Sequence, residues 1–198
     1  MSLTERLLAD IREEFPDFRL VAKSESRLSR AIDRTLKIVT LGGQRGYLTV
    51  YHTVIGNTLY IPSSWQAATD AERAIVLRHE RVHLRQRRRY GTWLMTFLYL
   101  VPFVPLGLAY GRARIEWEAY AETLRATAEI QGQAAVRDPA LRRRIVGRFT
   151  GPDYGWMWPF RATVERWYDE VLRSIHAGPE PEDDAHAAHA AAHGERAA

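Results

Sequence analysis

The chain of 198 residues contains no cysteine. This absence excludes a disulfide framework and any metal site built on thiolates, and it is typical of a reducing compartment. Histidine is also scarce in the body of the chain, where only His52, His79 and His83 occur. Two of these three fall within one pentapeptide. The other histidines lie at or beyond the end of the last expected helix: His176, His186, His189 and His193.

A secretory signal is the second missing feature. Residues 1–6 open an amphipathic helix with acidic residues, and no apolar segment follows them. We therefore expect a cytoplasmic protein, with membrane association as the alternative. The length predicts a single domain over 1–176. Residues 177–198 are rich in Gly, Pro, Asp, Glu, Ala and His, a composition that predicts a disordered tail.

The pentapeptide is His79-Glu80-Arg81-Val82-His83, an HExxH pattern. On a helix, residues four apart share one face, so His79 and His83 can reach the same metal ion. Glu80 is then close enough to take a proton from a metal-activated water. The pattern predicts a zinc site with Glu80 as the general base.

The flanking residues place this pentapeptide on a helix. Thr69 and Glu72 form a capping box, and Asp70 adds negative charge to the first turn. The alternative is an ordinary amphipathic helix that carries two histidines by coincidence, and these helix signals disfavour it.

Catalytic zinc takes three protein ligands and leaves one position for water. We expect the third ligand on a second helix, over residues 115–122. Glu116 is the first candidate, because Ala119 one turn later permits close approach. Glu118 is the rival and Glu122 a more distant one, and Glu116 and Glu118 cannot point the same way on a helix. A solvated acidic face is the alternative interpretation.

HExxH followed by Glu-x-x-Ala resembles the zincin metallopeptidases of the gluzincin type. It is similar to their HtpX-like group and its minimal soluble relatives over residues 47–122. The resemblance implies Zn²⁺ as cofactor, Glu116 as third ligand, and a mostly helical α+β domain with a small β-hairpin or sheet before the HExxH helix. Those families often carry Asp where this chain has Tyr120, and that Asp orients a ligand histidine.

Two tyrosines are candidates for a polar role in the site. Tyr120 can take the orienting role, and either Tyr120 or Tyr154 can donate a hydrogen bond to an oxyanion. Tyr154 belongs to an aromatic loop over residues 151–160. The alternative for this loop is a hydrophobic plug packed on the core.

Residues 47–61 predict a β-hairpin with a Gly-first turn at Gly56-Asn57. In zincins an edge strand at this place binds extended substrate by strand addition. His52 alternates with apolar residues in the first strand, which predicts a core position, with a substrate contact as the alternative. Amphipathic helices are expected over 3–14, 24–39 and 161–175.

Residues 93–110 carry no charge and are about long enough to cross a bilayer. A single crossing would separate Glu116 from the two histidines, and Pro102 and Pro105 interrupt a helix. We therefore expect a buried helix to about Val101 and a turn after it, with peripheral or re-entrant membrane contact as the alternative.

The net charge is +4, with basic residues clustered directly after HExxH: Arg85, Arg87, Arg88 and Arg89. Because aromatic interleaving is missing, the cluster gives no clear nucleic-acid signal and predicts a solvated helix end. The expected function is a zinc metallopeptidase acting on a peptide or protein. The alternative is a non-catalytic, zinc-stabilised binding protein, with residues 93–110 as a membrane contact.

Overall fold

A computed structural model describes residues 1–24, 26, 52–95, 106–151, 157, 158 and 160–177. Several predictions lie outside these residues. They are most of the helix expected over 24–39, the hairpin before His52, the apolar segment over 96–105, Tyr154, and the tail after Ala177.

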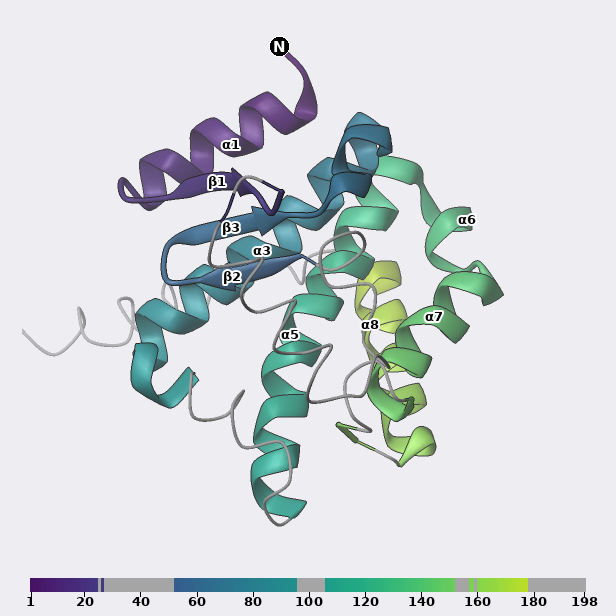
Figure 1. The fold of residues 1–198 in the computed structure, drawn as a ribbon. Helices are drawn as coiled ribbons and strands as arrows, with labels where there is room; N and C mark the ends of the chain where they lie inside the picture. Colours follow the sequence, from purple (N-terminus) through teal and green to yellow (C-terminus); the bar gives the residue numbers. More distant parts are fainter. Residues whose placement is uncertain (25, 27–51, 96–105, 152–156, 159, 178–198) are drawn as a thin grey trace, which may run out of the picture.

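The described residues are mostly helical, with one small mixed sheet, so the α+β class is confirmed. In Figure 1, α5 lies between α3 on one side and α6 to α8 on the other. The elements in chain order are α1 (Leu3–Glu14), β1 (Arg19–Ala22), β2 (Thr53–Ile55), β3 (Thr58–Ile61), the short 3₁₀ helix η1 (Ser63–Ala67), α3 (Asp70–Tyr90), α5 (Leu106–Gln131), α6 (Gln133–Val136), α7 (Pro139–Thr150) and α8 (Arg161–Ala177).

The sheet has the strand order β1-β3-β2, with β1 parallel and β2 antiparallel to β3. The expected turn is present between β2 and β3, where Gly56 has a φ of +62°, a backbone conformation that favours glycine. The parallel partner β1 was not predicted. Within the described residues β2 is an edge strand.

The helix that carries HExxH begins as the sequence predicts. Thr69 Oγ1 accepts from the Glu72 N–H at 3.2 Å, and the Glu72 carboxylate accepts from the Thr69 N–H at 2.7 Å. Asp70 has a further role, because its carboxylate accepts from the backbone N–H groups of Leu3 (2.8 Å) and Thr4 (3.1 Å) at the start of α1. The same few residues therefore begin α3 and fix α1 against it.

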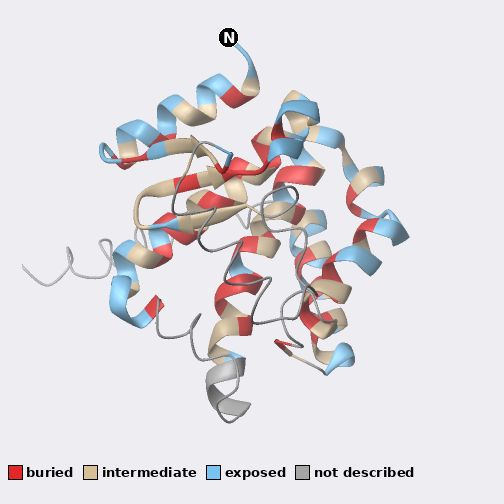
Figure 2. Ribbon diagram, viewed as in Figure 1, coloured by how far each residue is buried: buried red, intermediate tan, exposed pale blue. Residues whose placement is uncertain are grey.

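Buried apolar side chains form two main clusters. Figure 2 marks buried positions in red along α3 and α5, which contribute to these clusters. The first joins α1, the sheet and α3 through residues such as Ile11, Leu59 and Leu77. The second joins α5, α7 and α8 through residues such as Trp117 and Phe149. His79 and His83 of HExxH contact α5, whereas Arg81 pairs with Glu14 of α1.

The expected buried helix from Trp93 is wrong at its start. Trp93 is 89% exposed and Leu94 47% exposed, whereas Met95 is buried against Ile115 and Tyr90. A helical turn at the surface buries only one face, so an unbroken apolar run does not imply burial all round. None of the described helices is long and apolar enough to cross a membrane.

The expected solvated helix end after HExxH is seen for three of the four arginines in the cluster, since Arg85, Arg88 and Arg89 are exposed. Arg85 and Arg88 are more than half exposed and pair with Glu14 of α1. Arg87 instead donates to Asn57 in the β2–β3 turn.

Candidate metal centre

Helices α3 and α5 bring three potential ligand atoms together. One atom each from His79, His83 and Glu116 lie within 4.8 Å of one another. The two Nε2 atoms are 3.3 Å apart, and His83 Nε2 is 3.8 Å from Glu116 Oε2. The four-residue spacing puts both imidazoles on one face of α3. Ala119, fully buried on α5, leaves room for the close approach.

The hydrogen bonds around His83 assign its tautomer. Gln86 donates through Nε2 to the Ile115 carbonyl at 2.9 Å and to the Glu118 carboxylate at 2.8 Å. Because both partners are acceptors, the orientation of the Gln86 amide is fixed. Its Oε1 therefore accepts from His83 Nδ1–H at 2.9 Å. His83 Nε2 is left with a free lone pair.

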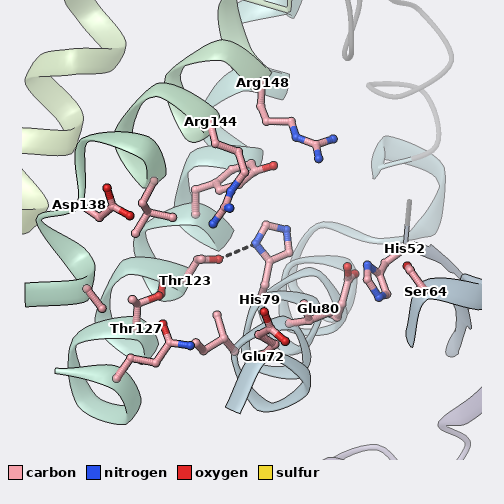
Figure 3. A pocket seen from close by; sticks show the side chains of 16 residues that line it. His52, Ser64, Glu72, His79, Glu80, Thr123, Thr127, Asp138, Arg144 and Arg148 are labelled. Atoms are coloured by element: carbon pink, nitrogen blue, oxygen red, sulfur yellow. Dashed lines mark hydrogen bonds between the residues drawn. The ribbon is translucent and has the colours of Figure 1, made fainter. Parts of the chain in front are cut away.

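The same reasoning applies to His79. Thr123 Oγ1 donates its one proton to the Ala119 carbonyl at 3.1 Å. It must then accept from His79 Nδ1–H, which lies 2.9 Å away (Figure 3). His79 Nε2 therefore carries no proton in this tautomer, and its lone pair is available as well.

Two lone pairs thus face each other at 3.3 Å, with the Glu116 carboxylate beside them. Between two neutral imidazoles this arrangement is repulsive, and either a proton shared by the two nitrogens or a metal ion bound to both relieves it. Tetrahedral zinc, with bonds of about 2.0–2.1 Å, separates its ligand atoms by roughly 3.3–3.4 Å. The donor set and the distance between the two Nε2 atoms fit that ion, whereas the Glu116 oxygen lies farther out, at 3.8 Å from His83 Nε2.

Glu80 lies next to these groups and is 7% exposed. Burial, with a smaller contribution from the Glu116 charge, raises the pKa of its carboxyl to about 7, although the charges of His83 and Lys23 act in the opposite direction. Lys23, at the end of β1, is fully buried and donates to Thr53 Oγ1 at 2.8 Å. A carboxyl with a pKa near neutrality can both accept and release a proton.

The remaining predicted site residues have other partners. Glu118 holds Gln86, and Glu122 pairs with Arg78 at 2.6 Å, so neither belongs to the group of three. Tyr120 packs its ring edge-to-face on His79, with centroids 4.9 Å apart. An orienting hydrogen bond at His79 Nδ1 is made with Thr123.

A pocket of about 730 Å³ opens beside His79 and Glu80 (Figure 3). His83 and Glu116 are not among its lining residues, and both are buried. The lining residues come from the sheet side, α3, α5, α6 and α7: His52, Ser64, Glu72, Ile75, Val76, His79, Glu80, Tyr120, Thr123, Thr127, Gln131, Ala135, Asp138, Leu141, Arg144 and Arg148.

His52 lies in the pocket wall, so its position fits the expected substrate contact as well as the expected core residue. Its ring packs edge-to-face on Trp65, with centroids 5.6 Å apart. Its Nε2 is buried without a hydrogen-bond partner among the described residues. Burial, helped by the charge of Lys23, lowers its pKa to about 4, so the ring is neutral at pH 7.

Gln86 and Thr123 are the two functional residues that the sequence reasoning missed. Each had a spacing signal: Gln86 follows His83 by three residues, and Thr123 follows Glu116 by seven. Both spacings keep a residue on the same helix face. Polar residues on the metal-facing side of either helix were the signal to look for.

No protein-family model, curated protein or solved structure matches the chain. The function therefore has to be inferred from the side chains that α3 and α5 bring together. The donor set of the candidate metal centre, the buried Glu80 and the adjacent pocket are the three features that bear on it.

Proposed function

We propose that the protein is a zinc-dependent metallopeptidase of zincin-like fold, with His79, His83 and Glu116 as metal ligands. The observation that carries the proposal is the pair of Nε2 lone pairs held face to face next to Glu116. Each imidazole is locked by its own hydrogen bond, as is usual for metal-ligating histidines. The pocket beside Glu80 favours turnover over a purely structural metal.

A zinc ion at this centre would supply a Lewis acid that lowers the pKa of water and polarises a peptide carbonyl. Glu80 then accepts a proton on its carboxylate as water attacks the carbonyl carbon. It returns that proton to the nitrogen of the leaving amine. The burial that raises its pKa makes both transfers feasible near pH 7.

The surroundings of Glu80 support a peptide substrate. Strand β2 is an edge strand of the described sheet and contacts α3. An extended peptide can add to such an edge by backbone hydrogen bonds. His52, just before β2, adds a neutral imidazole to the pocket wall.

The test compares the full chain with Glu80→Gln and His79→Ala by elemental analysis and by hydrolysis of a fluorogenic peptide library. The tail histidines are the same in all three proteins, so their metal binding cancels. Wild type should hold one zinc more than His79→Ala. Glu80→Gln should keep that zinc and lose activity by about a hundredfold or more.

Two outcomes would contradict the proposal. An equal zinc content per chain in wild type and His79→Ala would rule out the proposed metal centre. Undiminished peptide hydrolysis by Glu80→Gln would rule out Glu80 as the general base. Zinc that is held and required for folding, with no peptide cleaved by wild type, would instead identify a zinc-stabilised binding protein.

A further inference from the structure

Two arginines of α7 line the pocket beside the candidate metal centre. Arg144 and Arg148 are four residues apart, and Leu141, one turn earlier, lines the same pocket. The two arginines lie on a different face from Ile145 and Phe149, which are buried with Leu141 in the hydrophobic cluster of α5, α7 and α8. Because of the helix period, one face of α7 packs on the core and another faces the pocket.

Figure 3 shows both guanidinium groups extending from α7 on the side where the His79 imidazole lies. Arg144 is exposed and Arg148 half-buried. A ligand that reaches His79 and Glu80 would therefore pass beside two permanent positive charges. Guanidinium groups bind carboxylates through paired, charge-assisted hydrogen bonds.

Two of the three acidic residues that line the same pocket make local hydrogen bonds, and the third is Glu80. Glu72 is held in the capping box by Thr69, and Asp138 accepts from the Ala140 N–H at 2.8 Å as the N-cap of α7. Hydrogen bonds from Thr69 are the main cause that lowers the pKa of Glu72, and the charge of Arg144 contributes to it.

Arg142, a neighbouring arginine on α7, forms an ion pair that joins two helices. Arg142 makes two hydrogen bonds to the Asp169 carboxylate of α8, at 2.6 and 3.1 Å. It therefore ties α7 to α8 and is not a pocket residue. Arg144, two residues later, points to the pocket instead.

We propose that Arg144 and Arg148 recognise a carboxylate of the substrate, so that the enzyme prefers peptides with an acidic side chain or a free C-terminus near the cleaved bond. The inference rests on the proposed peptidase function, because that function supplies peptides as ligands. Gln131, also in the lining, offers an amide group to the rest of such a peptide.

The experiment uses matched peptides derived from one cleaved by wild type. Glu replaces Gln at each position in turn, and every peptide is made with a free and an amidated C-terminus. We expect kcat/KM to be about tenfold or more higher for the preferred carboxylate form. Dependence on the C-terminal group would identify the terminal carboxylate, and dependence on one Glu position would identify a side chain.

The double variant Arg144→Gln/Arg148→Gln should lose this preference, with kcat/KM falling for the carboxylate peptides and unchanged for their neutral counterparts. Arg143→Gln is the matched control, since it removes an exposed charge from the same helix outside the pocket. It should keep the preference. Equal cleavage of both forms by wild type, or discrimination retained by the double variant, would overturn the proposal.

Failure of the peptidase function would look different, because wild type would then cleave no peptide at all. In that case, labelled acidic peptides from the library and their Glu-to-Gln, amidated counterparts are compared by fluorescence anisotropy. Tighter binding of the acidic form by wild type, abolished in the double variant, would support carboxylate recognition without turnover. Equal binding of both forms would overturn it.

Discussion

Helix α3 has two buried faces of opposite character. One face carries Leu77 and Leu84, which are almost fully buried against α1 and the sheet. The other presents His79, His83 and Gln86 to α5. The apolar face stabilises the fold by removing hydrocarbon from water. The polar face is also largely enclosed, with His83 and Gln86 buried and His79 half-buried at the pocket, yet it gains no comparable energy from burial.

The polar face is instead ordered by hydrogen bonds. Buried polar groups are costly unless they are paired, and here the Nδ1 atoms of both imidazoles have partners. Only the two Nε2 atoms are left facing each other. The comparison indicates that one face maintains the fold and the other holds a ligand, so changes on the two faces should have different effects.

Leu77→Ala should cause the largest loss of stability. Leu77 is fully buried, and truncation leaves a cavity, so the metal-free protein should lose about 3 kcal/mol of unfolding free energy. The measurement is urea denaturation with a chelator present. Below the unfolding transition, the variant should still bind zinc as wild type does. A variant with normal stability, or one that is folded but unable to bind zinc, would contradict the separation of the two faces.

Gln86→Leu should mainly lower the affinity for zinc. Losing the hydrogen bond to His83 Nδ1 frees the imidazole, and zinc affinity should fall by about 10- to 100-fold in a competition assay with a chromophoric chelator. Metal-free stability should fall by only about 1–2 kcal/mol, because the Ile115 carbonyl loses its partner.

Thr127→Val is the matched control for that change. Thr127 is buried on α5 and donates to the Thr123 carbonyl at 2.7 Å, but it contacts neither imidazole. Its loss should lower stability slightly and leave zinc affinity unchanged. If both variants weakened zinc binding equally, general loosening of the α3–α5 contact would be the cause, and the orienting role of Gln86 would be rejected.

Local signals predicted much of this arrangement. The capping box at Thr69, the Gly56 turn and the HExxH spacing each depend on residues close in sequence, and the structure has the first two as expected. Placing Glu116 beside the histidines needed one long-range step, which the small Ala119 made possible to foresee. The final helix also begins at the expected Arg161.

The rest depended on tertiary contacts that no local pattern records. The pairing of β1 with β3 joins residues nearly forty apart in the chain, as in Arg19 with Thr58. The role of Glu118 emerges only when α5 lies against Gln86. The exposure of Trp93 depends on which face of a short turn contacts the protein, which hydropathy does not indicate.

The smallest predicted effect concerns the charged rim of the apolar face, where Glu14 of α1 accepts from Arg81 and Arg85 of α3 at 2.6–2.9 Å. The hydrogen bond from Arg85 is the main cause that lowers the pKa of Glu14 from 4.5 to about 2. A folded-state pKa below the unfolded one contributes stability above pH 4.5, and that contribution disappears as the pH falls toward 2.

Glu14→Gln should therefore cost about 1–2 kcal/mol at pH 7, after allowance for solvent screening of the exposed arginines. The difference from wild type should shrink steadily below pH 4.5, as followed by urea denaturation between pH 7 and pH 2.5. Glu13→Gln, an exposed neighbour on α1, should show little effect at any pH. If the loss of unfolding free energy in Glu14→Gln stayed constant with pH, Glu14 would stabilise the α1–α3 contact through its packing. The charge of this rim would then contribute no stability.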